Sequence, residues 1–131
     1  MVKSLLHYPD ADKYDTSLWE RMIIGGAPVP VSIAREAQEK FGVVCYQAYG
    51  MTETCPMLTL ATLKDNLKKL PFEEQLAYRA KTGKPVFGVE LRVVDENGKD
   101  IEPNGVDVGE IIVRGNNVMK GFCRIRKQPP K

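Results

Sequence analysis

The chain has 131 residues, of which 43% are hydrophobic and 27% charged, a balance that fits one soluble globular domain or a piece of a larger one. Its net charge of +2 is too small to indicate a nucleic-acid partner, and no apolar run approaches the roughly 20 residues of a membrane span. The three cysteines have neither the even count of a disulfide framework nor the CxxC spacing of a zinc site. We therefore expect a cytoplasmic protein with free thiols and no integral membrane segment.

The first half of the chain predicts a strand, a helix and a second strand. Residues 22–24 form a short apolar run that two glycines end. Residues 31–42 follow with apolar side chains at helical spacing and a final glycine, and residues 43–49 form a second, almost wholly apolar run. This arrangement has the length of a βαβ unit with parallel strands. Ahead of it, Leu18 and Trp19 are expected to be the first bulky anchors of a polar lead-in.

The second half predicts antiparallel β-structure. Residues 57–70 look irregular or weakly helical, and a helix is expected over residues 70–81, where a proline and two acids mark its first turn. Apolar and polar residues then alternate over residues 89–93, and Asn97-Gly98 is a strong hairpin signal. The sequence GEIIVRG, at residues 109–115, predicts a further strand bounded by glycines.

These elements divide the chain into three parts, with residues 1–82 as an α/β part, 83–122 as an antiparallel β part and 123–131 as a basic tail. The tail has the composition of a phosphate- or membrane-binding patch, although we expect a disordered or non-native chain end there. The α/β part is too short for a complete doubly wound sheet. We therefore expect a piece of a larger protein, with exposed sheet edges through which a homo-oligomer can form.

Small and polar residues follow both predicted parallel strands. The Gly-Gly pair at 25–26 leaves the first strand, and Tyr49 and Gly50 leave the second, with Thr52 and Glu53 close behind. Because the carboxyl ends of parallel strands share one edge, both segments are expected to line one pocket. Glycines admit a flat ring, tyrosine offers a stacking face, a hydroxyl suits a phosphate oxygen and a carboxylate suits Mg²⁺. A nucleotide pocket is one interpretation, and a turn with a packing tyrosine and a threonine cap is the other.

Four linked segments carry a resemblance to a known family. They read MIIGGAPVP, YQAYGMTET, KTGKPVFGVELRVVD and GEIIVRGNNVMKGF, between about Tyr14 and Phe122. In order and spacing they resemble the adenylate-forming, or AMP-binding, enzymes, and more narrowly the acyl-CoA synthetases of medium- and long-chain fatty acids. The resemblance implies an α/β fold, in which this chain is a fragment of the large N-terminal domain. The antiparallel part would then belong to a distorted β-barrel.

The resemblance also implies a reaction and a set of site residues. Such enzymes convert a carboxylic acid and ATP to an acyl-adenylate and pyrophosphate, and the thiol of CoA then displaces AMP. Mg²⁺ would bind at Glu53, Thr52 would contact the phosphate that becomes part of AMP, and these two residues are the expected catalytic pair. Ala48 stands where the family more often has glycine. The residues implied around the nucleotide are Gly25, Gly26, Ala27, Pro28, Tyr49, Gly50, Met51 and Thr52.

The resemblance leaves alternatives open. The family's phosphate loop, its ribose-binding aspartate and its adenylation lysine have no counterpart in residues 1–131, so this chain alone is expected to be inactive. Aryl-CoA ligases and amino-acid adenylation domains share the four segments, and the helical stretch at 64–81 favours a fatty acid. A remnant or interaction module that keeps the scaffold without catalysis is the other class of function.

Overall fold

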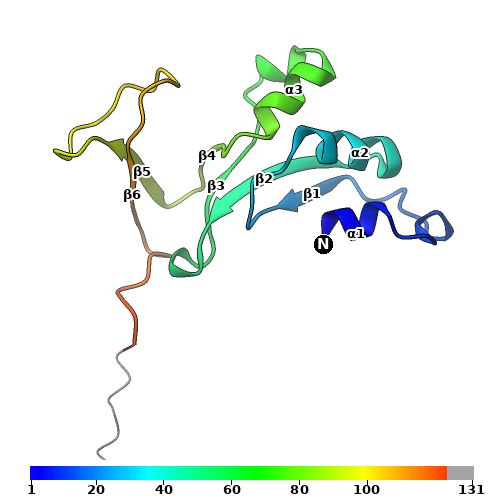
Figure 1. Cartoon of the computed structure of the whole chain (residues 1–131), viewed down its shortest axis with the longest axis horizontal. Coiled ribbons are helices and arrows are strands. Elements are labelled where there is room, and N and C mark those ends of the chain that lie inside the picture. The colour runs from blue at the N-terminus through cyan, green and yellow to red at the C-terminus, as the bar shows by residue number, and fades with distance from the viewer. Residues whose placement is uncertain (124–131) are drawn as a thin grey trace, which may run out of the picture.

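The computed structural model describes residues 1–123, which form two β-sheets joined in sequence, with the helices on the first (Figure 1). The sheets have the strand orders β1-β2-β3-β4 and β5-β6. None of the helices in this part of the chain is long and apolar enough to cross a membrane. The elements are α1 (Val2–Leu6), η1 (Ala11–Lys13), β1 (Arg21–Ile24), α2 (Val31–Phe41), β2 (Val44–Gly50), η2 (Thr52–Thr54), β3 (Met57–Leu60), η3 (Leu67–Lys69), α3 (Phe72–Arg79), β4 (Lys84–Pro85), β5 (Val89–Val94) and β6 (Glu110–Gly115), where η marks a 3₁₀ turn.

The predicted βαβ unit is confirmed. β1 and β2 pair in parallel, with Met22 opposite Cys45, and α2 makes the crossover between them. The helix ends at Gly42, as its sequence predicted. Because the two strands are parallel and adjacent, the segments that leave their carboxyl ends emerge at the same edge of the sheet.

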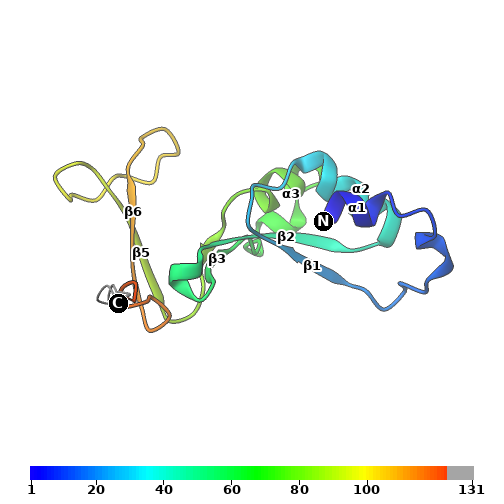
Figure 2. The same ribbon diagram turned by 60° about the horizontal axis from the view of Figure 1, so that its bottom comes forward.

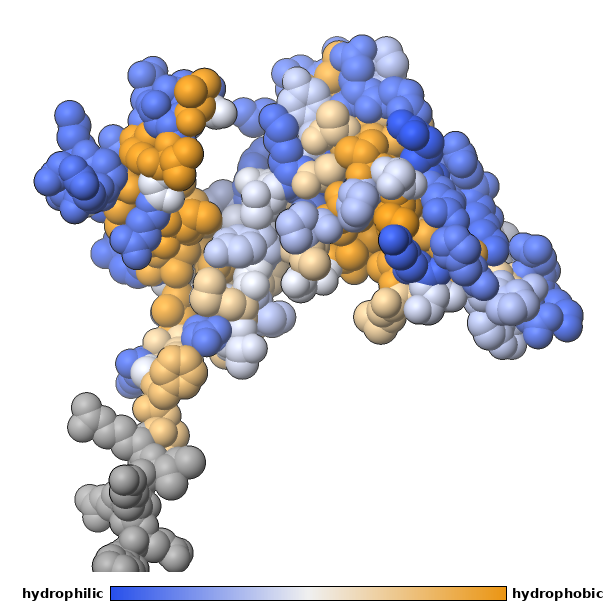
Figure 3. All heavy atoms as spheres, viewed as in Figure 1, coloured by the Kyte–Doolittle hydropathy of each residue, from blue (hydrophilic) through white to orange (hydrophobic). Residues whose placement is uncertain are grey.

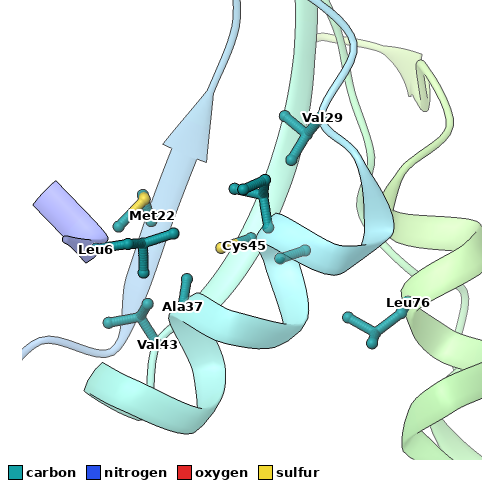
Figure 4. Close-up of a cluster of buried hydrophobic side chains, with 9 residues drawn as sticks. Leu6, Met22, Val29, Ala37, Val43, Cys45 and Leu76 are labelled. Atoms are coloured by element: carbon teal, nitrogen blue, oxygen red, sulfur yellow. The ribbon is translucent and has the colours of Figure 1, made fainter. Parts of the chain in front are cut away.

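The core lies between α2 and the parallel strands (Figure 4). The buried face of α2 carries small and branched side chains at helical spacing, which lets the helix approach the sheet closely. Leu6 from α1 reaches this core and is only 2% exposed, and Leu76 from α3 closes another side. The full cluster is Leu6, Met22, Val29, Ile33, Ala34, Ala37, Val43, Cys45 and Leu76.

The expected anchor at Leu18 is wrong, because this side chain is 93% exposed. Its neighbour Trp19 does pack, with its ring centroid 5.4 Å from that of Phe41. Leu6 takes the anchoring role instead, and the ammonium of Lys40 donates a hydrogen bond to the Leu6 carbonyl at 2.6 Å, which holds α1 against α2. The lead-in is therefore an ordered cover over one end of α2.

Residues 57–60 are a strand and not the irregular segment that the sequence predicted. β3 pairs antiparallel with β2, with Ala48 opposite Leu60, and β4 adds a short fourth strand. Leu58 and Thr59 are both buried although they point to opposite faces of the sheet. Such a segment has no fully exposed face, so its four residues carry only a weak strand pattern, and its pairing with β2 decides its structure. Antiparallel pairing therefore begins within the first half of the chain.

The second sheet contains the predicted hairpin turn. β5 and β6 are antiparallel, with Leu91 opposite Val113, and Figure 2 shows them set apart from the first sheet. The turn at Asn97-Gly98 is present, but the strand expected after it makes one isolated bridge, between Val94 and Asp100. Within residues 1–123 this sheet is an open pair of strands and not a closed barrel. The predicted basic tail falls at residues 124–131, apart from Cys123, and so lies outside the described residues.

Candidate functional site

Two adjoining hollows meet at the carboxyl end of β2. Both are lined by Gly26, Ala48, Tyr49 and Gly50. The first has a volume of about 280 Å³ and is completed by Ala27, Pro28, Gln47, Ala80 and Thr82. The second, of about 400 Å³, is completed by Ile23, Gly25, Met51, Thr52, Pro56 and Met57. The segments after β1 and β2 therefore line common cavities, as the parallel pairing predicted.

The wall of the first hollow is held by Gln47, whose side chain is buried beside β2. Its Oε1 accepts a hydrogen bond from the Val29 N–H at 2.8 Å, and its Nε2 donates to the carbonyls of Ala48 at 2.9 Å and Ala27 at 3.3 Å. One amide thus satisfies polar groups on β2 and on the loop after β1. Since these groups are remote from water, losing the amide would leave them unpaired, so Gln47 fixes the Gly-Ala-Pro loop against the strand.

The turn that follows β2 is closed from within by Thr54. This buried hydroxyl accepts from the Met51 N–H at 3.1 Å and lies within donating distance of the Met51 carbonyl at 3.0 Å and the Pro56 carbonyl at 3.1 Å. The ladder between β2 and β3 slips by one residue between Tyr49 and Gly50. This bulge bends the strand end, which is a usual way to redirect side chains next to a binding site.

Thr52 and Glu53 project from this turn in different settings. Thr52 is exposed on the rim of the second hollow, whereas Glu53 is half-buried and lines neither hollow. Within residues 1–123 no group forms a salt bridge or hydrogen bond with the Glu53 carboxylate, and no cluster of three or more metal-ligating side chains occurs. A lone free carboxylate fits Mg²⁺ that is held mainly by substrate phosphates, and does not fit a preformed metal cage.

The structure brings together eight of the nine residues that the sequence singled out, with Glu53 as the exception on the adjacent turn. Sequence reasoning missed Gln47, Thr54 and Asn117. Asn117 lies beyond β6, and its Nδ2 donates to the Thr54 carbonyl at 2.7 Å. The position of Gln47 inside an apolar strand was a usable signal for a buried polar role.

One cationic side chain, that of Arg79 on α3, packs against Tyr46 of β2 and lines neither hollow. The guanidinium of Arg79 stands 5.1 Å from the ring centroid of Tyr46, and its Nε and Nη1 are buried without a hydrogen-bond partner in the described structure. Burial raises the pKa of the neighbouring Cys45 thiol, and the charge of Arg79 partly opposes that rise. No lysine or arginine within residues 1–123 lines either hollow. The site therefore offers shape and neutral polar groups, with a single carboxylate nearby.

Comparisons with known proteins agree on one family. The sequence model described as "AMP-binding enzyme" matches residues 1–123. The 3-methylmercaptopropionyl-CoA ligase of Ruegeria lacuscaerulensis is 40% identical over 109 residues, which cover 83% of this chain and 20% of that protein. The long-chain-fatty-acid–CoA ligase of Thermus thermophilus is 34% identical over 119 residues, covering 91% of this chain and 22% of that one.

A solved structure gives the same result in three dimensions. The crystal structure of a long-chain-fatty-acid-CoA ligase (FadD1) from Archaeoglobus fulgidus superposes with a TM-score of 0.68 at 28% identity, covering 96% of this chain and 24% of that chain. Further matches are named as ligases of medium-chain fatty acids and of 2-succinylbenzoate. The chain thus spans about a fifth of the length of the curated relatives it matches.

Proposed function

This chain belongs to the AMP-binding, or adenylate-forming, enzymes, and from that premise we propose that it forms the substrate-binding edge of an acid–thiol ligase. The proposed reaction joins a carboxylic acid to ATP as an acyl-adenylate with release of pyrophosphate, and the thiol of CoA then displaces AMP. The observation that carries the proposal is the pair of adjoining hollows that share Tyr49 and Gly50. An acyl-adenylate has two unlike halves joined at a phosphate, and two cavities that share four lining residues suit such a molecule.

The linings of the hollows suggest which half each one takes. The first hollow carries Thr82 and Tyr49 beside the Gly-Ala-Pro loop, a combination that suits a flat, polar ring such as adenine. The second carries the apolar side chains of Ile23 and Met57, which suit the tail of a carboxylic acid. The acid's carboxyl group and the α-phosphate would then meet near Gly50.

Thr52 and Glu53 are placed to act at the phosphate in this arrangement. The Thr52 hydroxyl, on the rim of the second hollow, would donate to an oxygen of the phosphate that becomes part of AMP. The free Glu53 carboxylate would hold Mg²⁺ together with the ATP phosphates, and the bound ion would supply neutralisation of phosphate charge. Both groups come from one short turn, so its conformation sets their spacing.

A fatty acid is our proposed substrate class, since the second hollow is walled by aliphatic and thioether side chains without a buried charge. Relatives named for fatty acids, 3-methylmercaptopropionate and 2-succinylbenzoate share this region, so aromatic acids are the competing class. The free state of Cys45, Cys55 and Cys123 suits a reducing compartment, and we place the reaction in the cytoplasm.

We expect the 131-residue chain to bind nucleotide weakly and not to turn over. No cation within residues 1–123 lines the hollows, so nothing there neutralises the β- and γ-phosphates of ATP. The test is incubation with ATP, Mg²⁺, CoA and either fatty or aromatic acids, with AMP and acyl-CoA measured by mass spectrometry. Turnover that disappears in Glu53→Ala would overturn the expected inactivity and would show that this chain builds its own phosphate site.

The catalytic assignment is tested in a polypeptide that carries this segment together with the remaining four-fifths of the family sequence. Thr52→Ala and Glu53→Ala should each slow pyrophosphate release about 100-fold without changing the melting temperature. Thr62→Ala, at an exposed position outside both hollows, is the matched control and should leave the rate unchanged. Equal rates in all three variants would reject the assignment of Thr52 and Glu53, whereas no pyrophosphate release by the unmodified polypeptide would favour a scaffold without chemistry.

A further inference from the structure

The segment that follows β6 crosses back to the turn that carries Thr52 and Glu53. Asn117 Nδ2 donates to the Thr54 carbonyl at 2.7 Å and to the Met57 carbonyl at 3.1 Å. The Met119 N–H donates to the Glu53 carbonyl at 2.9 Å. These contacts join positions about sixty residues apart in sequence, and in Figures 1 and 2 the chain after β6 lies against the η2 turn.

The three accepting carbonyls all belong to the turn and its exit into β3. Thr54 organises the inside of this turn through its hydroxyl, whereas the carbonyls on its outer side point to the segment after β6. A carboxamide is well suited to them, because its NH₂ group has two donor hydrogens for two acceptors. The contact is part-buried, so carbonyls that lost it would not be fully satisfied by water.

The position of Asn117 is itself fixed by its surroundings. The Val118 N–H donates to the Gly115 carbonyl at 3.1 Å, which closes a tight bend directly after β6. A Cβ at Gly115 would lie 2.5 Å from Asn117 Oδ1, so the end of β6 leaves room for this amide. The bend and the small residue together aim the NH₂ group at the turn.

We propose that Asn117 is a positioning residue, which holds the η2 turn from outside and thereby fixes the Thr52 hydroxyl and the Glu53 carboxylate relative to the hollows. The functional part of this inference rests on the proposed function. It also means that hydrogen bonds join the segment after β6, and so the second sheet, to the turn that carries Thr52 and Glu53. A displacement of that sheet would move Glu53, whose own carbonyl is one of the three acceptors.

The first experiment measures amide hydrogen exchange by NMR in the 131-residue chain and needs no ligand. Asn117→Ala should speed exchange at the Met119 and Thr54 amides about thirtyfold, because two hydrogen bonds are lost. The amide of Cys45 in β2 should be unchanged, which shows that the fold persists. Asn116→Ala, at an exposed neighbour with no hydrogen bond in the described structure, is the control and should leave all three amides unchanged.

Asn117→Asp adds a signature that a general loss of packing would not produce. The ionised carboxylate has no donor and faces two carbonyls, so exchange at Met119 should be as fast as in the alanine variant near neutral pH. Below pH about 4 the carboxyl group is protonated and regains one donor, so part of the protection should return. Two results would show that Asn117 does not hold the η2 turn. One is unchanged exchange in Asn117→Ala, and the other is no recovery of protection in Asn117→Asp at low pH while the Cys45 amide stays protected.

The second experiment compares AMP with adenosine in binding titrations of the same variants. If the hydrogen bonds of Asn117 position Thr52 for the phosphate, Asn117→Ala should weaken AMP binding several-fold and leave adenosine binding unchanged. Faster exchange with unaltered AMP binding would overturn the positioning role, although it would still show that Asn117 holds the η2 turn. If the unmodified chain binds neither compound, the proposed function of this chain and the functional half of the inference both fail. The exchange experiment alone then decides whether Asn117 holds the η2 turn.

Discussion

Of the three glycines that line the hollows, Gly50 should be the one whose replacement by alanine disturbs the site most. Gly50 lies at the bulge between β2 and β3, opposite Met57. A Cβ built on it would stand 1.7 Å from the Pro56 carbonyl oxygen and 2.9 Å from the Met57 Cα. Both are main-chain atoms, so no side-chain rotation can relieve the overlap.

The magnitude follows from the displacement that this overlap requires. Ordinary van der Waals contact between the methyl carbon and the oxygen needs roughly 3.4 Å, so β3 must move by more than about 1.5 Å at this point. That shift opens the end of the β2–β3 ladder and disturbs the hydrogen bonds of Thr54, each worth about 1 kcal/mol. We expect a loss of about 3 kcal/mol in unfolding free energy, or about 10 °C in melting temperature for a chain of this size.

Thermal and urea unfolding followed by circular dichroism would measure this loss. Gly98→Ala is the matched comparison, because Gly98 has a φ of 76° but nothing within 4 Å of the added Cβ. Its cost is backbone strain alone, whereas the cost at Gly50 is steric. If Gly50→Ala were no more destabilising than Gly98→Ala, the described approach of β3 to the end of β2 would be wrong.

Four further results are expected. Gly98→Ala should cost about 1 kcal/mol in a melting experiment, and an unchanged curve would contradict the left-handed turn. Arg79→Met should leave stability unchanged or raise it by about 1 kcal/mol, because two buried nitrogens have no partner in the described structure; a clear loss would show that stacking on the aromatic ring outweighs desolvation. Iodoacetamide should modify Cys55 quickly and Cys45 only after unfolding, since burial protects the Cys45 thiol and raises its pKa, which lowers its thiolate fraction; equal rates would refute the buried core position. Light scattering should detect dimers or larger species, because β1 is an open edge strand and apolar side chains gather over β5–β6 (Figure 3), and a clean monomer at high concentration would contradict this.

Local pattern was sufficient where an element carries its own signal. The spacing of Ile33, Ala34 and Ala37 predicts the buried face of α2, and Asn97-Gly98 predicts its turn without any knowledge of the rest of the chain. The parallel pairing of β1 and β2 followed from the length of the crossover, and with it the shared edge. The common edge at which both loops emerge was therefore accessible from sequence.

The remaining features depend on partners that are distant in sequence. β3 is a strand because β2 offers it an edge, and the core is filled by Leu6, twelve positions before the exposed Leu18. Gln47 acts on a loop eighteen residues before it, and Asn117 acts on a turn more than sixty residues before it. No local pattern encodes such contacts, so the sequence predicted the two loops after β1 and β2 and missed the lining residues from β3 and α3 and the side chains that hold the loops in place.

Nucleotide mapping by NMR tests most directly whether the two hollows are a nucleotide and acid site. Titration of the labelled chain with AMP should shift the amide signals of Gly26, Ala27 and the residues from Gln47 to Thr52, with a dissociation constant on the order of millimolar, because few contacts offset the entropy of association. Adding a fatty acid should shift Ile23 and Met57 instead. Shifts confined to β5 and β6, or none at AMP concentrations of about 10 mM, a tenfold excess over such a constant, would contradict the assignment of these hollows.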